Sequence, residues 1–298
     1  MPISAPSRHG PREGAGVCGR RRAPARIMGH MARLHAQAFV EAVPRDWFEE
    51  YVRALLDRAG NLTLDEDGWI EGDEELADVA LVEGDHLTVG AKYQQHTDPP
   101  EGETGDGTTT ELVITSWDRR GEVSAAVTTW HPEGDKTAWT VKLSRPDALR
   151  SVVTGGTYSG AKRLQQVSWA ARLDCGQWWR QASGGGGQAP ATVLLRHAHM
   201  QGNLRISPSS AGFGKWRVKV TLVVRGRSWL WPFAALVLLA VRGRLEAKFQ
   251  EMVGEMAENW NADVKELLAS DPRAAEFRIP RFGRRQEEVD RWIEEQHG

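Results

Sequence analysis

The sequence predicts an α+β fold in which an antiparallel sheet is followed by one long C-terminal helix. Strand-like segments succeed one another between residues 87 and 225, and short turn sequences such as DRRG and PEGDK separate some of them, as in antiparallel hairpins. An amphipathic helical pattern then continues to about residue 270. The chain has 298 residues, of which 26% are charged and 40% hydrophobic, so it can bury a core.

The first predicted elements are a strand and a helix. Apolar side chains recur at every second position of residues 34–40, which predicts a half-buried strand. The sequence PRDWFEEYVRALLDRAG then places its apolar residues at helical spacing, with Pro44 in the first turn and Gly60 at a C-terminal cap. We therefore expect a helix of about four turns.

Six further strands are predicted from runs rich in β-branched and aromatic residues that turn residues separate. They are expected at residues 87–95, 109–117, 122–131, 137–143, 192–206 and 215–225. The intervening segment 145–191, which contains the flexible sequence SGGGGQAP, shows no clear pattern. We interpret it as an insertion.

The long helix is predicted from about residue 228 to Ser270, where Asp271-Pro272 stops it because a residue before proline avoids the helical region. Such a helix would be about 60 Å long. In its second half, apolar residues form a stripe along one face of the helix. The residues of the stripe are Phe249, Met252, Val253, Met256, Trp260, Val264 and Leu267.

This order of elements resembles the helix-grip fold of the START-like superfamily, which includes polyketide cyclases, plant hormone-binding proteins and lipid-transfer domains. The segments GDHLTVGAKYQQ, TELVITSWDRRGEV and FQEMVGEMAENWNADVKELL are similar to parts of bacterial members. The resemblance implies a curved seven-stranded antiparallel sheet wrapped around the C-terminal helix over residues 33–271. Residues 1–32 would be a disordered leader, and residues 272–298 a charged tail with a short helix.

In such a fold, the space between sheet and helix is a concave and mainly apolar pocket. Strand parity and helical spacing select the side chains that would line it. They are Tyr93, Trp139, Val141, Leu195, His197, His199, Trp216, Val218, Phe249, Met252, Met256 and Trp260. The first hypothesis is therefore non-catalytic binding or transport of a hydrophobic or amphipathic small molecule of lipid, polyketide or isoprenoid type, with no cofactor.

The second hypothesis is an enzyme of the polyketide cyclase or aromatase kind. His197 and His199 would lie on one side of a strand and would donate or accept protons near neutral pH. The same spacing can chelate a metal, but a metal site needs a third or fourth ligand, for which His131 is a guess. We therefore expect no metal, and the superfamily has no shared catalytic signature to carry over.

The charge and the cysteine content argue against a nucleic-acid-binding protein and a disulfide-stabilised domain. The 38 basic and 40 acidic residues leave a net charge of -2, which gives no overall field for attracting nucleic acid. Cys18 and Cys175 form no CxxC motif or disulfide framework, and residues 1–33 contain no apolar run of secretory type. A cytoplasmic location is expected.

The third hypothesis concerns residues 229–241, which are all apolar or aromatic. A membrane-spanning helix needs about 20 such residues, so this run is too short. A helix that lies on a sheet needs only one apolar face. The additional apolar residues of this run therefore predict another contact. The candidates are the insertion at residues 145–191, a second copy of the protein, or the surface of a membrane. A membrane or a second copy would be contacted through Trp229, Trp231, Phe233 and Leu236.

Overall fold

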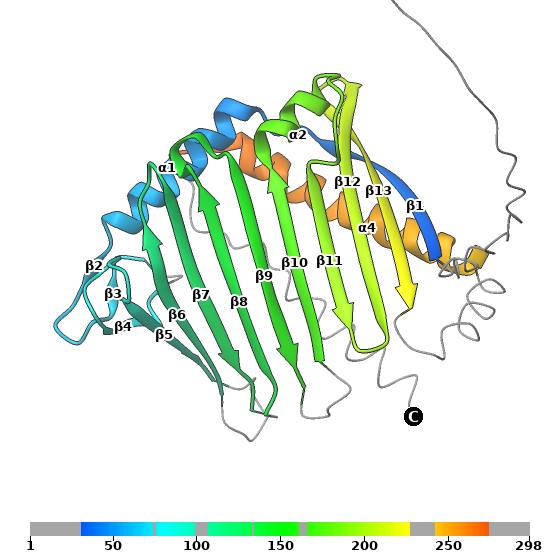
Figure 1. Ribbon diagram of the computed structural model, residues 1–298. Helices are drawn as coiled ribbons and strands as arrows, with labels where there is room; N and C mark the ends of the chain where they lie inside the picture. The colour runs from blue at the N-terminus through cyan, green and yellow to red at the C-terminus, as the bar shows by residue number, and fades with distance from the viewer. Residues whose placement is uncertain are drawn as a thin grey trace, which may run out of the picture.

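The computed structural model describes residues 31–73, 76–98, 107–132, 134–160, 166–226 and 242–273. They form an antiparallel sheet of eleven strands in the order β1-β13-β12-β11-β10-β9-β8-β7-β6-β5-β4 (Figure 1). A long helix, α4, follows the last strand. The predicted α+β class, the antiparallel sheet and the C-terminal helix are thus confirmed.

From β4 onward, each strand of this sheet pairs with the next strand along the chain, and β1 pairs with β13. The strands are β1 (Met31–Glu41), β4 (Val79–Glu83), β5 (Lys92–Thr97), β6 (Thr108–Trp117), β7 (Glu122–Trp130), β8 (Lys136–Ser144), β9 (Ser151–Ser159), β10 (Gln166–Asp174), β11 (Ala191–His197), β12 (Met200–Gly212) and β13 (Lys215–Gly226). Strands β2 (Thr63–Leu64) and β3 (Ile70–Glu71) pair separately. The helices are α1 (Arg45–Gly60), the 3-10 helix η1 (Pro146–Ala148), α2 (Cys175–Ala182) and α4 (Arg242–Ala269).

The predicted count of seven strands is wrong. Strands β4, β9 and β10 were not predicted, and the strand expected at residues 192–206 is a hairpin, β11 and β12, with its turn at residues 198–199. The strand expected at residues 87–95 begins only at Lys92, because residues 84–90 form turns in which Leu87 has a φ of 56°. Segment 145–191 contributes η1, β9, β10 and α2, and its two strands lie in the middle of the sheet.

Strand β9 was hidden because Gly155 and Gly156 lie at its centre, and glycine weakens a strand pattern. The structure shows why Gly156 is there. A Cβ atom at this position would lie 2.4 Å from the Ala138 oxygen and 2.6 Å from the Trp139 Cβ. Strands β8 and β9 therefore approach more closely here than any other residue would allow.

Helix α4 covers the free edge of β1. The Gln250 side chain accepts a hydrogen bond from the Gln37 N–H and donates one to the Gln37 carbonyl. Asn261 bonds the Glu41 N–H and the Phe39 carbonyl in the same way. Between Gln37 and Glu41, side chains of α4 thus take the place of a further strand, which leaves less of this edge open to pairing with other chains.

The face of the sheet toward α4, called here the inner face, carries the main core. The buried residues of this first core cluster come from β1, β13, α2, α4 and the segment after β1. They are Leu34, Ala36, Ala38, Val40, Val43, Ala182, Trp216, Val218, Val220, Phe249, Val253, Ala257 and Val264. In Figure 1 the strands lie in front of α4, so that the view is onto the opposite, outer face.

A second core cluster lies on the inner face at the other end of the sheet. Its buried residues are Ala91, Tyr93, Ile114 and Ala125. Helix α1 is held near this end by Arg119, which bonds Asp57 of α1 and, at 3.3 Å, Asp147 of η1. The two clusters share no residue, so the inner face has a packed core at each end.

The predicted helical stripe is only partly right. Phe249, Val253 and Val264 are buried, but Met252, Met256 and Trp260 are 44%, 56% and 42% exposed. The reason is the position of α4 at the sheet edge, where one side of the helix meets the core and the adjacent side meets β1. The Trp260 Nε1 donates to the Glu41 carbonyl at 3.1 Å, so this indole binds the edge strand.

Some predictions fall on residues 1–30, 227–241 and 274–298, which lie outside the described residues. They concern the leader, most of the tail, and the contact through Trp229, Trp231, Phe233 and Leu236. Within the described ranges, no helix combines the length and the apolar character that crossing a bilayer requires.

Candidate functional site

Between the two core clusters, the inner face continues as an apolar strip on β8, β9, β10 and β11. Cross-strand partners share a face of a sheet, and the register pairs Trp139 with Gly156, Gly156 with Trp169, and Trp169 with Leu195. The neighbouring row consists of Val141, Thr154, Ala171 and Val193. These eight residues are called the inner strip, and their strands occupy the middle of the sheet in Figure 1.

The inner strip is less covered than the regions on either side. None of its eight residues is among the buried members of the two clusters. Seven of them are half-buried, and Leu195 is 42% exposed. Gly156 adds no side chain between the positions of Trp139 and Trp169. Such a surface suits an apolar chain or a flat ring system.

The residues predicted to line a cavity are spread over three places. Trp139, Val141 and Leu195 belong to the inner strip. Trp216, Val218 and Phe249 are buried members of the first core cluster. The three α4 residues Met252, Met256 and Trp260 are exposed.

Tyr93 lies in the second core cluster with 6% of its surface exposed. Its hydroxyl oxygen accepts a hydrogen bond from the Leu87 N–H at 2.8 Å and lies 2.8 Å from His86 Nδ1. His86 Nε2 faces the Ala59 carbonyl at 3.0 Å, which can only accept, so Nε2 carries a proton and donates it. Burial raises the pKa of Tyr93 above its ordinary value. These bonds fix the end of α1 to the sheet.

The histidine pair lies at the turn between β11 and β12. The ring centroids of His197 and His199 are 5.5 Å apart, and the His199 N–H donates to His197 Nδ1 at 3.4 Å. His197 ends β11 opposite Val167 and shares the inner face with Leu195. His199 is exposed in the turn, so the two imidazoles do not project from one strand as expected. Among the described residues, no group of three or more His, Cys, Asp or Glu side chains could hold a metal ion.

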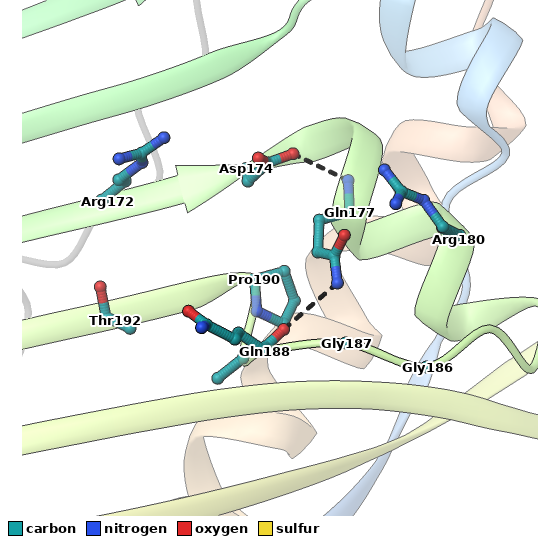
Figure 2. Close-up of a pocket in the computed structure, with 10 residues that line it drawn as sticks. Arg172, Asp174, Gln177, Arg180, Gly186, Gly187, Gln188, Pro190 and Thr192 are labelled. Atoms are coloured by element: carbon teal, nitrogen blue, oxygen red, sulfur yellow. Dashed lines mark hydrogen bonds between the residues drawn. The ribbon is translucent and has the colours of Figure 1, made fainter. Parts of the chain in front are cut away.

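A hollow of about 550 Å³ lies beside α2, on the side of the outer face (Figure 2). Its polar lining includes Arg172, Gln177, Arg180 and Thr192. Asp174 accepts a hydrogen bond from the Gln177 N–H at 2.8 Å, and the Gln177 amide donates to the Gln188 carbonyl at 3.4 Å. The apolar inner strip and this polar hollow therefore offer surfaces of opposite chemistry.

Sequence reasoning missed Trp169 and Gly156, which form the middle of the inner strip. A signal for Trp169 was present, because Val167, Trp169, Ala171 and Leu173 alternate with Ser168, Ala170 and Arg172. Gly156 could not be placed from the sequence alone. The residues of the hollow were not predicted either, although the glycine tract that borders it is recognisable in the sequence as a flexible segment.

The described cysteine, Cys175, is not a reactive group. It is 1% exposed at the start of α2, and burial raises the pKa of its thiol to about 11. At neutral pH the thiol is protonated, and a protonated thiol is a poor nucleophile and metal ligand.

No protein-family model matches this chain, and no curated protein matches it. Among solved structures, one match is the crystal structure of the Zhui aromatase/cyclase from Streptomyces sp. R1128, at 15% sequence identity. The match covers 77% of this chain and 95% of that chain, with a TM-score of 0.21. So weak a similarity leaves the function to be argued from the residues described above.

Proposed function

We propose that the protein binds or transports a hydrophobic or amphipathic small molecule, of lipid, polyketide or isoprenoid type, on the inner strip. The observation that carries the proposal is the position of Leu195. It lies in register with Trp169 on an apolar face and is 42% exposed between two packed cores. A helix-grip arrangement of START-like type is part of the same proposal, supported by the pairing of β1 with β13 and by α4 on the inner face.

The physical basis is the removal of apolar surface from water. Burying such surface contributes roughly 25 cal/mol per Å², and the strip offers indole, leucine and valine side chains with no charged group among its eight residues. The Thr154 hydroxyl and the indole N–H groups of Trp139 and Trp169 are the polar side-chain groups of the strip. A ligand that is mainly apolar with few polar groups fits this composition.

The proposal is tested first by identifying what the protein carries. The full chain is purified without detergent, extracted with organic solvent, and the extract is analysed by mass spectrometry. A stoichiometric hydrophobic compound is expected. Binding of the fluorescent probe N-phenyl-1-naphthylamine, and its displacement by that compound, then gives an affinity.

The variant that tests the location is Leu195→Lys, with Val82→Lys as its matched control. Both residues are exposed aliphatic side chains on strands, 42% and 51% respectively, so neither change should unfold the protein. A lysine in the strip would place an ammonium group against the ligand, and we expect Leu195→Lys to weaken probe binding about tenfold or more. Equal affinities for the two variants, or no ligand at all, would reject the inner strip as the site.

The second candidate function is catalysis of cyclase type, and the position of His197 favours it. This residue is half-buried at the end of the inner strip, on the same face as Leu195. Cyclisation of a linear poly-β-ketone, followed by chromatography, should then be lost in His197→Gln but retained in His199→Gln. Absence of turnover by the wild type rejects this alternative.

A further inference from the structure

The outer face of β10, β11, β12, β13 and β1 is strongly basic. The register places the outward side chains of these strands on one surface, opposite to the core positions. Its exposed basic residues include Arg33, Arg196, Arg205, Arg217, Lys219 and Arg225. At the outward positions of the same strands, the acidic side chains are Glu41 and Asp174.

Both of those carboxylates have partners within the protein. Glu41 lies 3.7 Å from Lys215 and 3.6 Å from Lys265, and Asp174 receives the N–H of Gln177 at the start of α2. They therefore do little to neutralise the arginines around them. Because the whole chain has a net charge of -2, the positive charge of this face is balanced elsewhere, and the charges are segregated in space.

An exposed phenylalanine stands at one end of this face. Phe213 forms the tip of the β12–β13 hairpin and is fully exposed, at 104% of its reference surface. Gly212 and Gly214 flank it, and Phe213 itself has a φ of 50°, which is rare for a bulky residue. The turn thus holds an aromatic side chain out into solvent, two residues before the first basic positions of β13.

We propose that this outer face docks on a lipid bilayer with anionic headgroups, with Phe213 inserted at the level of the headgroups. Basic residues near an anionic membrane each contribute about a fivefold change in partitioning, and an aromatic ring is favoured at the membrane interface. The charges are spread over several strands and form a broad surface, as a bilayer requires. A nucleic acid strand would be expected to follow a groove with stacked aromatic rings, and the Phe39 ring on this face is covered by the Arg217 guanidinium at 5.5 Å.

The experiment measures sedimentation of the full chain with vesicles of phosphatidylcholine, with and without phosphatidylglycerol. We expect binding only when the anionic lipid is present, and release as salt screens the charges. The triple variant Arg205→Glu, Arg217→Glu and Lys219→Glu should lower the partition coefficient by on the order of a hundredfold. The variant Phe213→Asn, in which asparagine suits the positive φ, should lower it about tenfold.

The matched control replaces three exposed basic residues outside this face by glutamate, namely Arg53, Arg120 and Lys248. It should bind as the wild type does. Circular dichroism checks that each variant is folded, and glutamine substitutions replace the glutamates if the triple variant is not. The proposal is overturned if the control loses binding equally, or if Leu236→Glu abolishes binding while the triple variant binds normally. It is also overturned if an RNA or DNA oligonucleotide binds to this face more tightly than the anionic vesicles do.

Discussion

The α4-covered end of the inner face and the inner strip belong to the same sheet, yet they differ in what covers them. At the covered end, Trp216, Val218 and Val220 lie against Phe249 and Val253 with less than a tenth of their surface exposed. In the strip, the equally apolar Trp139, Trp169 and Leu195 are half-buried or exposed. Alternation of side chains therefore predicts which face is apolar, but the partner of that face decides whether it becomes core or binding surface.

The largest expected effect tests the packing of the covered end. Phe249→Ala removes a side chain that is 6% exposed at the centre of the first core cluster, and should lower the free energy of unfolding by about 3–5 kcal/mol. Trp169→Ala in the inner strip should cost clearly less, because that indole is already partly in contact with water. Urea unfolding of both variants measures the difference. Equal losses would mean that the strip is part of the core.

Burial of Cys175 at the start of α2, outside both core clusters, also predicts a dependence of stability on alkaline pH. The thiol of Cys175 has its pKa raised to about 11 by burial in the folded protein, against an ordinary value of 9.0. The folded state therefore favours the protonated thiol. Stability from this group is fully present below pH 9, falls as the pH rises from 9 to about 11, and the total loss is about 2–3 kcal/mol.

The measurement is urea unfolding at a series of alkaline pH values, with Cys175→Ala as the comparison. In the alanine variant, the free energy of unfolding should decline less between pH 9 and 11. Burial also raises the pKa of Tyr93, and the decline that comes from this residue should remain. Reaction of folded wild-type protein with iodoacetamide at neutral pH should be slow. Parallel pH profiles for the two proteins would show that Cys175 is in contact with water.

These regions also differ in how far the sequence predicts them. The buried face of β13, the first helix and the end of α4 near Ser270 follow from apolar spacing and a proline, which are local signals. The middle of the sheet does not follow from such signals, because the two central glycines of β9 interrupt the pattern of a strand. Spacing also cannot tell a side chain that lines a pocket from one that fills it, and Phe249 is a buried member of the first core cluster.

Substitutions at two glycines test the close approach of β8 and β9. Gly156→Ala should lower the free energy of unfolding by about 1–3 kcal/mol through overpacking, because its Cβ would collide with the backbone of β8. Gly254 in α4 has no atom within 4 Å of such a Cβ, so Gly254→Ala should raise stability by up to about 1 kcal/mol. Thermal unfolding of both variants provides the comparison. A neutral Gly156→Ala would mean that β8 and β9 are not as close as described.

The smallest expected effect concerns the edge of the covered end. Asn261→Ala removes the hydrogen bonds to the Glu41 N–H and the Phe39 carbonyl, and should cost about 1 kcal/mol, because these groups can turn to water instead. The exposed Asn259 of the same helix is the matched control, and Asn259→Ala should leave stability nearly unchanged. The larger consequence should be in the rate of association.

With part of β1 uncovered, association through this edge becomes easier, so light scattering of Asn261→Ala should rise during incubation well before that of Asn259→Ala. If both variants stay equally monomeric, the side chains of α4 stabilise β1 without protecting it from other chains.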